Sequence, residues 1–229
     1  MNRILFISLF QDSPLRAEKT LSLVDLIKNG GIGGQIIIGL LFVLLLMAIY
    51  IYFERWFAIR AAGKIDKSFM DQIKLYVGQG KIDAAQALCL KEDRPVARLV
   101  AKGISRIGRP LEDINTAIEN AGRLEVYKLE KNVSILATIA GAAPMIGFLG
   151  TVIGMILSIF EISNAGGNID MKLLSDGLYT AMTTTVAGLI VGIVGYITFN
   201  HLVVKTNKVV YQMEATSLEF LDLLNEPAV

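Results

Sequence analysis

Residues 132–160 read NVSILATIAGAAPMIGFLGTVIGMILSIF, and none of these 29 residues is Asp, Glu, Lys or Arg. Residues 29–53 and 177–204 are two further stretches without a charged side chain, 25 and 28 residues long. At about 1.5 Å per helical residue, each stretch can cross a hydrocarbon core roughly 30 Å thick. The sequence therefore predicts an all-α membrane protein with three transmembrane helices.

Composition and charge placement agree with a membrane protein and predict its orientation. Of the 229 residues, 53% are hydrophobic and 19% are charged, which is too apolar for an ordinary soluble domain of this size. Residues 54–131 contain 15 Lys or Arg against 11 Asp or Glu, whereas residues 161–176 contain one Lys against three acidic residues. Because cationic loops stay in the cytoplasm, we expect the N-terminus outside and the C-terminus inside.

The charge pattern divides the chain into seven segments. Apolar and polar residues alternate at helical spacing from Leu21 to Asn29, and the glycine-rich stretch that follows predicts a short interfacial helix ended by a turn. The predicted segments are an external N-terminal segment with this helix (1–34), transmembrane helix 1 (35–53), a cytoplasmic helical region (54–131), transmembrane helix 2 (132–160), an external loop (161–176), transmembrane helix 3 (177–204) and a cytoplasmic C-terminal helix (205–229).

Turn residues predict three interruptions in the cytoplasmic region, at 78–80, 93–95 and 108–110. Beyond the last turn, apolar residues recur at three- and four-residue steps toward the second span. Gly122 is the only glycine or proline on the way. We therefore expect one long helix to rise from the cytoplasm into the membrane, and the third helix to extend into the cytoplasmic region in the same manner.

The second and third spans are rich in small residues, unlike the first. Small residues let helix backbones approach closely inside lipid, and two pairs have the four-residue spacing typical of such contacts. Tight packing without any role in transport explains this pattern equally well. The residues predicted to pack or kink the helices are Pro144, Gly147, Gly150, Gly154, Gly188 and Gly192.

Hydroxyl side chains in the same two spans are candidates for the lining of a wet pathway. At about 100° per residue, Thr151 and Ser158 fall on nearly one helix face, as do Thr180 and Thr184. For any single hydroxyl, a hydrogen bond to a carbonyl of its own helix is the favoured interpretation, but the set as a whole favours a polar lining. The spans contain no carboxylate, so a proton crossing here needs a titratable group from a partner helix.

Other classes of function find no support in the sequence. There is no nucleophile and base arrangement, no metal-ligand spacing and no phosphate-binding glycine loop, so we expect no enzyme, cofactor or metal. Cys89 is the only cysteine, which excludes an intrachain disulfide. The excess of cations near the membrane is explained by topology, so nucleic-acid binding is not expected.

Residues 120–156, NAGRLEVYKLEKNVSILATIAGAAPMIGFLGTVIGMI, resemble the signature of the MotA/TolQ/ExbB proton channel family, in which a long helix leads to an Ala-Pro kink and a G-[LF]-[LF]-G-T-V-x-G core. The segment 180–192, TAMTTTVAGLIVG, is similar to a second family signature, and Glu54-Arg55 to a third. Three spans resemble the ExbB branch more closely than the flagellar stator branch, which has four.

The resemblance implies a multi-pass protein of the bacterial inner membrane, with a periplasmic N-terminus, that forms a homopentamer in membrane lipid. The second and third helices would line a pore around an ExbD-like single-span partner that supplies a membrane Asp. Driven by proton-motive force, the complex would act through a TonB-like protein on outer-membrane transporters. Carried over by motif, the pore threonines are Thr151 and Thr185, while Thr180 stands where many relatives have Glu. A TolQ-like role in envelope integrity and a non-motor membrane scaffold remain alternatives.

Overall fold

The computed structural model describes residues 31–64, 68–164 and 171–225, and every regular element in these ranges is an α-helix. The predicted all-α class is confirmed. The interfacial helix predicted at 21–29 lies outside the described residues. In chain order the helices are α2 (Gly31–Ala62), α3 (Ser68–Gly78), α4 (Ile82–Glu92), α5 (Pro95–Ile104), α6 (Leu111–Glu130), α7 (Val133–Asn164) and α8 (Met171–Asn225).

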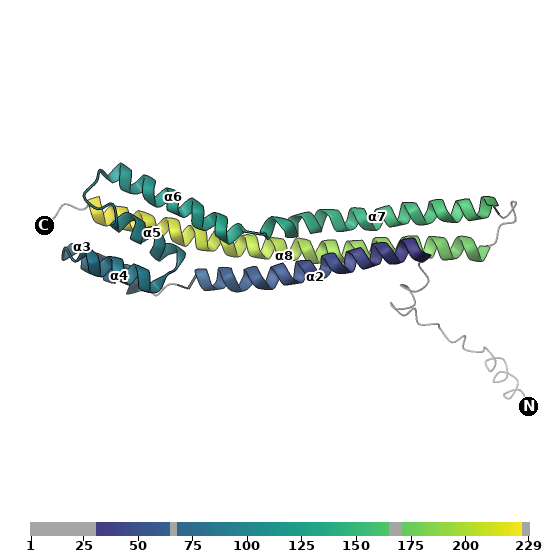
Figure 1. Cartoon of the computed structure of the whole chain (residues 1–229), viewed down its shortest axis with the longest axis horizontal. Coiled ribbons are helices and arrows are strands. Elements are labelled where there is room, and N and C mark those ends of the chain that lie inside the picture. Colours follow the sequence, from purple (N-terminus) through teal and green to yellow (C-terminus); the bar gives the residue numbers. More distant parts are fainter. Residues whose placement is uncertain (1–30, 65–67, 165–170, 226–229) are drawn as a thin grey trace, which may run out of the picture.

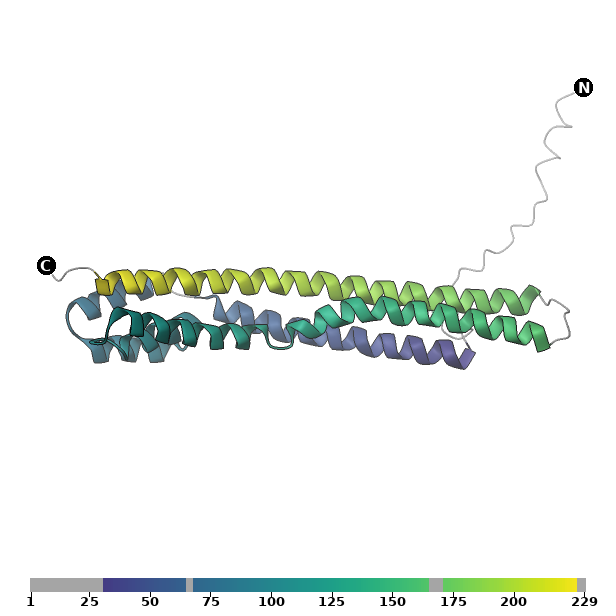
Figure 2. The same ribbon diagram turned by 90° about the horizontal axis from the view of Figure 1, so that it is seen from above.

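Helix α8 runs the whole length of an elongated molecule (Figure 1). Its 55 residues correspond to about 80 Å at 1.5 Å per residue, more than twice the thickness of a hydrocarbon core. Helices α2 and α7 lie along one half of α8, and α3 to α6 lie along the other half (Figures 1 and 2). The third helix therefore extends far beyond its uncharged stretch, as the sequence predicts.

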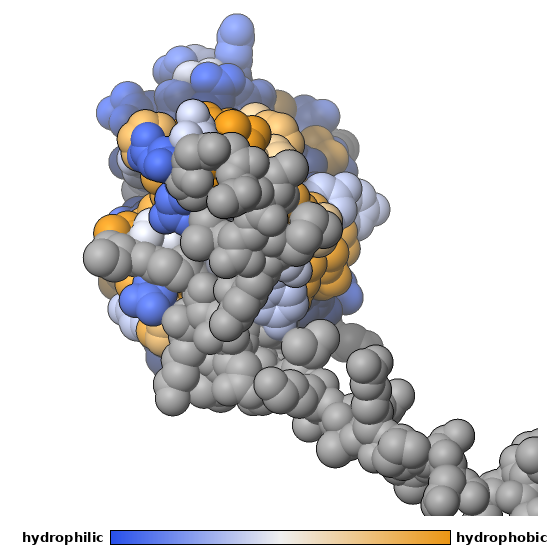
Figure 3. All heavy atoms as spheres, turned by 90° about the vertical axis from the view of Figure 1, so that its right-hand side faces the viewer, coloured by the Kyte–Doolittle hydropathy of each residue, from blue (hydrophilic) through white to orange (hydrophobic). Residues whose placement is uncertain are grey.

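The half of the molecule formed by α2, α7 and the first part of α8 is apolar outside as well as inside. Within the described residues, three helices are long and apolar enough to cross a membrane, which confirms the three predicted spans. Large side chains such as Phe42 and Phe148 are 58% and 63% exposed. Hydrophobic residues also reach the surface on the flanks of the bundle viewed along its axis (Figure 3). So many exposed apolar side chains on three neighbouring helices require lipid or other protein chains around them.

The helix expected to run unbroken into the second span is interrupted, so this prediction is wrong. Helix α6 ends at Glu130 and α7 begins at Val133. Between them Asn132 has φ +64°, a left-handed conformation that Asn adopts more readily than most residues. The break therefore arises without Gly or Pro.

The start of α2 also differs from the prediction. The glycines at 31, 33 and 34, expected to form a turn, belong to the first turns of α2. In contrast, the three cytoplasmic interruptions lie where the turn residues predicted them. Gly80 and Gly108 have φ +70° and +93°, and Asp93 caps α4 at φ +40°. A positive φ costs glycine little because it has no Cβ.

In the half formed by α3 to α6, the apolar core continues around the end of α8. Phe220 of α8 is fully buried, and a Cβ on Gly103 of α5 would lie 2.8 Å from Ile118 Cδ1 of α6. Cys89 of α4 is 1% exposed, and burial raises the pKa of its thiol to about 11. The thiol is thus protonated and unreactive at neutral pH.

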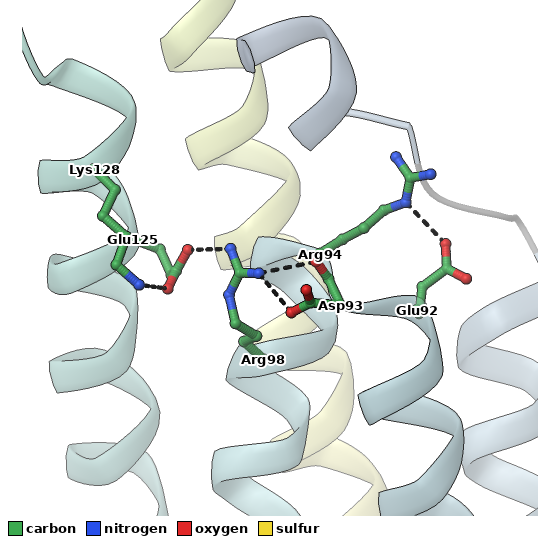
Figure 4. Close-up of polar contacts among 6 residues, drawn as sticks. All are labelled: Glu92, Asp93, Arg94, Arg98, Glu125 and Lys128. Carbon is green, nitrogen blue, oxygen red and sulfur yellow. Dashed lines mark hydrogen bonds and ion pairs between the residues drawn. The ribbon is translucent and has the colours of Figure 1, made fainter.

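A network of charged side chains joins α5 to α6 (Figure 4). Glu125 is 5% exposed and accepts hydrogen bonds from Arg98 Nη2 at 2.6 Å and Lys128 Nζ at 2.7 Å. Arg98 Nη1 also donates to Asp93 Oδ1 at 2.9 Å, so the turn before α5 is tied to the same network. Burial disfavours the charged form of Glu125, but the two hydrogen bonds outweigh it, and the pKa of Glu125 lies below its ordinary value of 4.5.

We expect Glu125→Gln to lower the free energy of unfolding by about 1–3 kcal/mol at neutral pH, because charge-assisted hydrogen bonds are lost at a buried position. A depressed pKa contributes stability above pH 4.5 that is lost as pH falls through the folded value. Thermal unfolding in detergent, followed from neutral to acidic pH, should therefore show a smaller acid-dependent loss in the variant. The exposed Glu119→Gln on the same helix is the control. Equal unfolding curves for both variants would contradict the role of the network.

Candidate functional site between two membrane helices

Helices α7 and α8 run antiparallel and approach each other most closely at glycines, where there is no room for a side chain. A Cβ added to Gly188 would lie 2.6 Å from Ala143 O and 2.9 Å from Gly147 Cα, far inside normal contact distance. An added Cβ would also lie within 3.0 Å of the opposite helix at Gly147, Gly150 and Gly192, and at 3.1 Å at Gly154 and Gly195. We call this contact the α7–α8 seam, formed by Ala140, Ala143, Gly147, Gly150 and Gly154 of α7 and by Ala181, Gly188, Gly192 and Gly195 of α8.

Pro144 lies within the seam, and α7 continues through it as one helix. Proline has no N–H, so the Ala140 carbonyl lacks its usual partner inside the helix. A Cβ on Gly192 would lie 2.6 Å from Pro144 Cγ and 3.1 Å from Ala140 O. Gly192 therefore lets α8 pass the ring. The kink expected at Pro144 stays a prediction.

The hydroxyls of Thr151 and Thr185 meet across the seam and hydrogen-bond to each other. Thr151 Oγ1 also lies 3.1 Å from Ala181 O, and Thr185 Oγ1 lies 3.2 Å from Gly147 O. Each hydroxyl has a single proton to donate. In one arrangement Thr185 donates to Gly147 O while Thr151 donates to Thr185. In the other Thr185 donates to Thr151, and Thr151 donates to Ala181 O or, at the longer distance of 3.5 Å, to Gly147 O. Both side chains are half-buried in the single chain.

Two other predicted pathway residues are enclosed by the helices. Thr184 is fully buried, faces Gly150, and donates to Ala181 O at 2.8 Å in its own helix, with Gly147 O at 3.3 Å. Ser158 is 4% exposed and donates to Gly154 O at 2.8 Å. In the single chain, these two hydroxyls satisfy backbone carbonyls.

Thr180, expected on one face with Thr184, has a different neighbour. It is half-buried, and a Cβ on Gly34 of α2 would lie 2.8 Å from its methyl carbon. Thr180 thus packs on α2, whereas Thr184 packs on α7. The sequence prediction that all five hydroxyls line one pathway stays untested, but only Thr151 and Thr185 meet each other in a half-exposed position.

No charged side chain lies along the uncharged stretches that build the seam, residues 132–160 and 177–204. The hydroxyl pair therefore has no carboxylate, ammonium or guanidinium group beside it along these stretches, and His201 lies near the end of the third one. Hydroxyls and carbonyls can orient a proton or water by hydrogen bonding, but they cannot store a proton as a carboxylate does.

A protein-family model described as the MotA/TolQ/ExbB proton channel family matches residues 91–215, more than half of the chain. The chain belongs to this family. The match runs from the end of α4 through α5, α6 and α7 into the last third of α8, so it contains the entire seam and the hydroxyl pair. Membership confirms the resemblance found in the sequence and places the chain in a family of proton channels and not of enzymes.

The curated relatives include both ExbB and TolQ proteins. Biopolymer transport protein ExbB of Aquifex aeolicus is 37% identical over 48% of this chain and 74% of its own length. A putative biopolymer transport protein ExbB homolog of Methanothermobacter thermautotrophicus is 30% identical over 44% of this chain, and the chain spans only 35% of that relative. Tol-Pal system protein TolQ of Haemophilus influenzae is 26% identical over 91% of this chain and 96% of its own length.

One contact in this member of the family escaped the sequence analysis. His201 Nδ1 of α8 lies 2.9 Å from the hydroxyl of Tyr52 in α2, with ring centroids 5.8 Å apart. Tyr52 stands at the end of the first uncharged stretch and His201 near the end of the third. These positions place both side chains at the same depth in the membrane, which the sequence does indicate. The sequence does not indicate that the first and third helices lie side by side.

We expect Gly188→Ala to destabilise the α7–α8 seam, because the new Cβ meets backbone atoms that cannot rotate away. Overpacking of this kind typically costs about 1–3 kcal/mol. Gly141→Ala in α7 is the control, since a Cβ there meets nothing within 4 Å. Thermal unfolding of both variants in the same detergent provides the measurement, and an unchanged melting temperature for Gly188→Ala would refute the close approach.

Proposed function

We propose that this chain is the channel-forming subunit of an ExbB–ExbD type motor, driven by proton-motive force, that energises TonB-dependent transport across the outer membrane. Its place in a proton channel family and its relatives named biopolymer transport protein support this assignment. The protein lies in the bacterial inner membrane, with the α3–α6 region in the cytoplasm, because that region carries the cationic excess.

The observation that carries the proposal is a polar pair in spans that contain no carboxylate. Thr151 and Thr185 present two hydroxyls between α7 and α8, and each can also receive a hydrogen bond. A proton that crosses a membrane needs a group that binds and releases it. That group is an Asp on a single-span, ExbD-like partner, and the threonine pair hydrogen-bonds to this carboxylate or to a water beside it.

Self-association follows from the exposed apolar faces. Residues on α7 and α8 such as Phe148, Phe160 and Ile190 are more than half exposed in the single chain. Copies of the chain bury part of this surface against each other, as a pentamer around the partner helices, and lipid covers the rest. A TonB-like protein then conveys the movement of the partner helices to outer-membrane transporters.

A TolQ-like subunit that maintains the cell envelope is the second candidate. It is favoured by the Haemophilus influenzae TolQ protein, whose match extends over 91% of this chain, whereas the Aquifex aeolicus ExbB match covers 48%. The lower identity, 26% against 37%, argues in the other direction. Both candidates share the proton-driven core. A non-motor scaffold, the third alternative, predicts no proton flux.

We expect Thr151→Val and Thr185→Val to leave assembly intact and to lower proton flux by about tenfold or more, because a hydrogen bond to a charged group contributes about 1.5–3 kcal/mol. Thr198→Val is the matched control, since its hydroxyl donates only to carbonyls of its own helix at 2.7 and 3.0 Å. Proton flux is measured in vesicles containing the chain with its partner. Wild-type flux in both seam variants would remove these hydroxyls from the mechanism.

Native mass spectrometry of the chain, co-expressed with the small membrane protein encoded beside it, tests the assembly. We expect a homopentamer that retains fewer copies of a single-span partner with a membrane Asp. A homo-oligomer that never binds such a partner would favour the scaffold. Restoration of envelope integrity instead of TonB-dependent uptake in a deletion strain would favour the TolQ-like role.

A further inference from the structure

The end of α2 lies beside the middle of α8 (Figure 1). A hollow of about 450 Å³ lies between these two segments. Each helix contributes one face at three- and four-residue spacing. The floor is apolar, because Ile59 and Val209 are only 2% and 4% exposed. The residues around the hollow are Trp56, Ile59, Arg60 and Gly63 from α2 and its end, and Lys205, Lys208, Val209 and Gln212 from α8.

The rim of this hollow carries three positive charges and no negative one. Arg60, Lys205 and Lys208 are all exposed, and no acidic residue lines the hollow. Among the described residues, the ion pairs involve other cations, such as Lys74 with Glu219 and Arg98 with Glu125. Like charges brought together from two helices repel each other unless an anion lies between them.

The hollow also lies at the level where the helices leave the membrane. The first uncharged stretch ends at residue 53 and the third at residue 204. Arg60 lies over the ring of Trp56, 5.3 Å from its centroid, and tryptophan is enriched at membrane interfaces. On α8, Val204 is 66% exposed one turn before Lys208, so an apolar surface leads directly to the cationic rim.

We propose that this hollow binds the phosphate headgroup of an anionic phospholipid. Arg60 is suited to hold two phosphate oxygens at once, while Lys205 and Lys208 supply point charges from the other side. The acyl chains extend along the apolar surface that includes Val204. Basic pockets between membrane helices are suited to such headgroups. A bound lipid would clamp the end of α2 onto α8.

A lipid explains the position of the site better than a soluble anion does. A free phosphate has no reason to bind at the edge of an apolar surface, and it gains nothing from the buried floor formed by Ile59 and Val209. The proposal rests on the three membrane spans and the geometry of the hollow. It does not require a motor function, and only the assignment to the cytoplasmic leaflet depends on the proposed orientation.

Native mass spectrometry of the full-length protein tests the site. The purified protein is incubated with equal amounts of phosphatidylglycerol and phosphatidylcholine, and the lipid retained after detergent removal is counted. We expect preferential retention of phosphatidylglycerol, and a loss of about tenfold or more in the double variant K205Q/K208Q, because each cation near an anionic lipid contributes several-fold to binding. The double variant K81Q/K91Q removes two exposed lysines of the other half and should retain the lipid like wild type.

Any one of the following results would overturn the proposal. The first is equal retention of the two lipids, or equal phosphatidylglycerol retention by wild type and K205Q/K208Q at matched melting temperatures. The second is displacement of the lipid by millimolar inorganic phosphate, which would assign the site to a soluble anion. The third is crosslinking of Lys205 or Lys208 to an acidic protein segment in membranes. If K205Q/K208Q melts at a lower temperature than wild type, its loss of lipid has two explanations, partial unfolding or lost binding. The variant R60Q removes a cation from the other helix and must then also reduce retention of phosphatidylglycerol.

Discussion

No Cβ atom fits between the backbones of α7 and α8 at Gly147 and Gly188, and the rest of the membrane half depends on that close approach. Inside lipid, burial of apolar surface does not drive helices together, so dispersion contacts and interhelical hydrogen bonds must do so. Only at this separation can the short side chains of Thr151 and Thr185 reach each other and the carbonyl of the opposite helix. The close packing of the glycines and the hydrogen bond between the threonines are therefore linked, because the glycines set the helix separation at which the two hydroxyls meet. A role of these hydroxyls in transport stays a prediction.

Helix α8 takes part in both halves of the molecule. Its first part forms the α7–α8 seam, its middle forms one wall of the cationic hollow, and Phe220 near its end anchors the α3–α6 half. A continuous helix of 55 residues bends little over one or two turns. Because α8 is continuous whereas a break at Asn132 separates α6 from α7, α8 is the unbroken helix that joins the seam to the α3–α6 half.

The sequence predicted the parts of this fold that follow from solvation and from backbone sterics. Charge is excluded from hydrocarbon, so the uncharged stretches marked three spans, and Gly80 and Gly108 marked turns because positive φ favours glycine. The break at Asn132 was missed because an apolar periodicity continues across it. Asn at positive φ is tolerated but not required, so its presence in a sequence does not predict a turn.

The sequence indicated which helices carry the candidate site residues, but not which neighbouring helix each residue contacts. Helical spacing placed Thr180 and Thr184 on one face, yet one packs on α2 and the other on α7, because a face wide enough to hold both also meets two neighbours. The Tyr52–His201 contact and the cationic hollow combine residues about 150 positions apart in sequence, and neither helix alone carries the pattern. Charge placement near Arg60 and Lys205 was interpreted as topology alone. Once α2 and α8 are paired, the same cations converge on one hollow, so residues that orient a membrane protein can also form its lipid contacts.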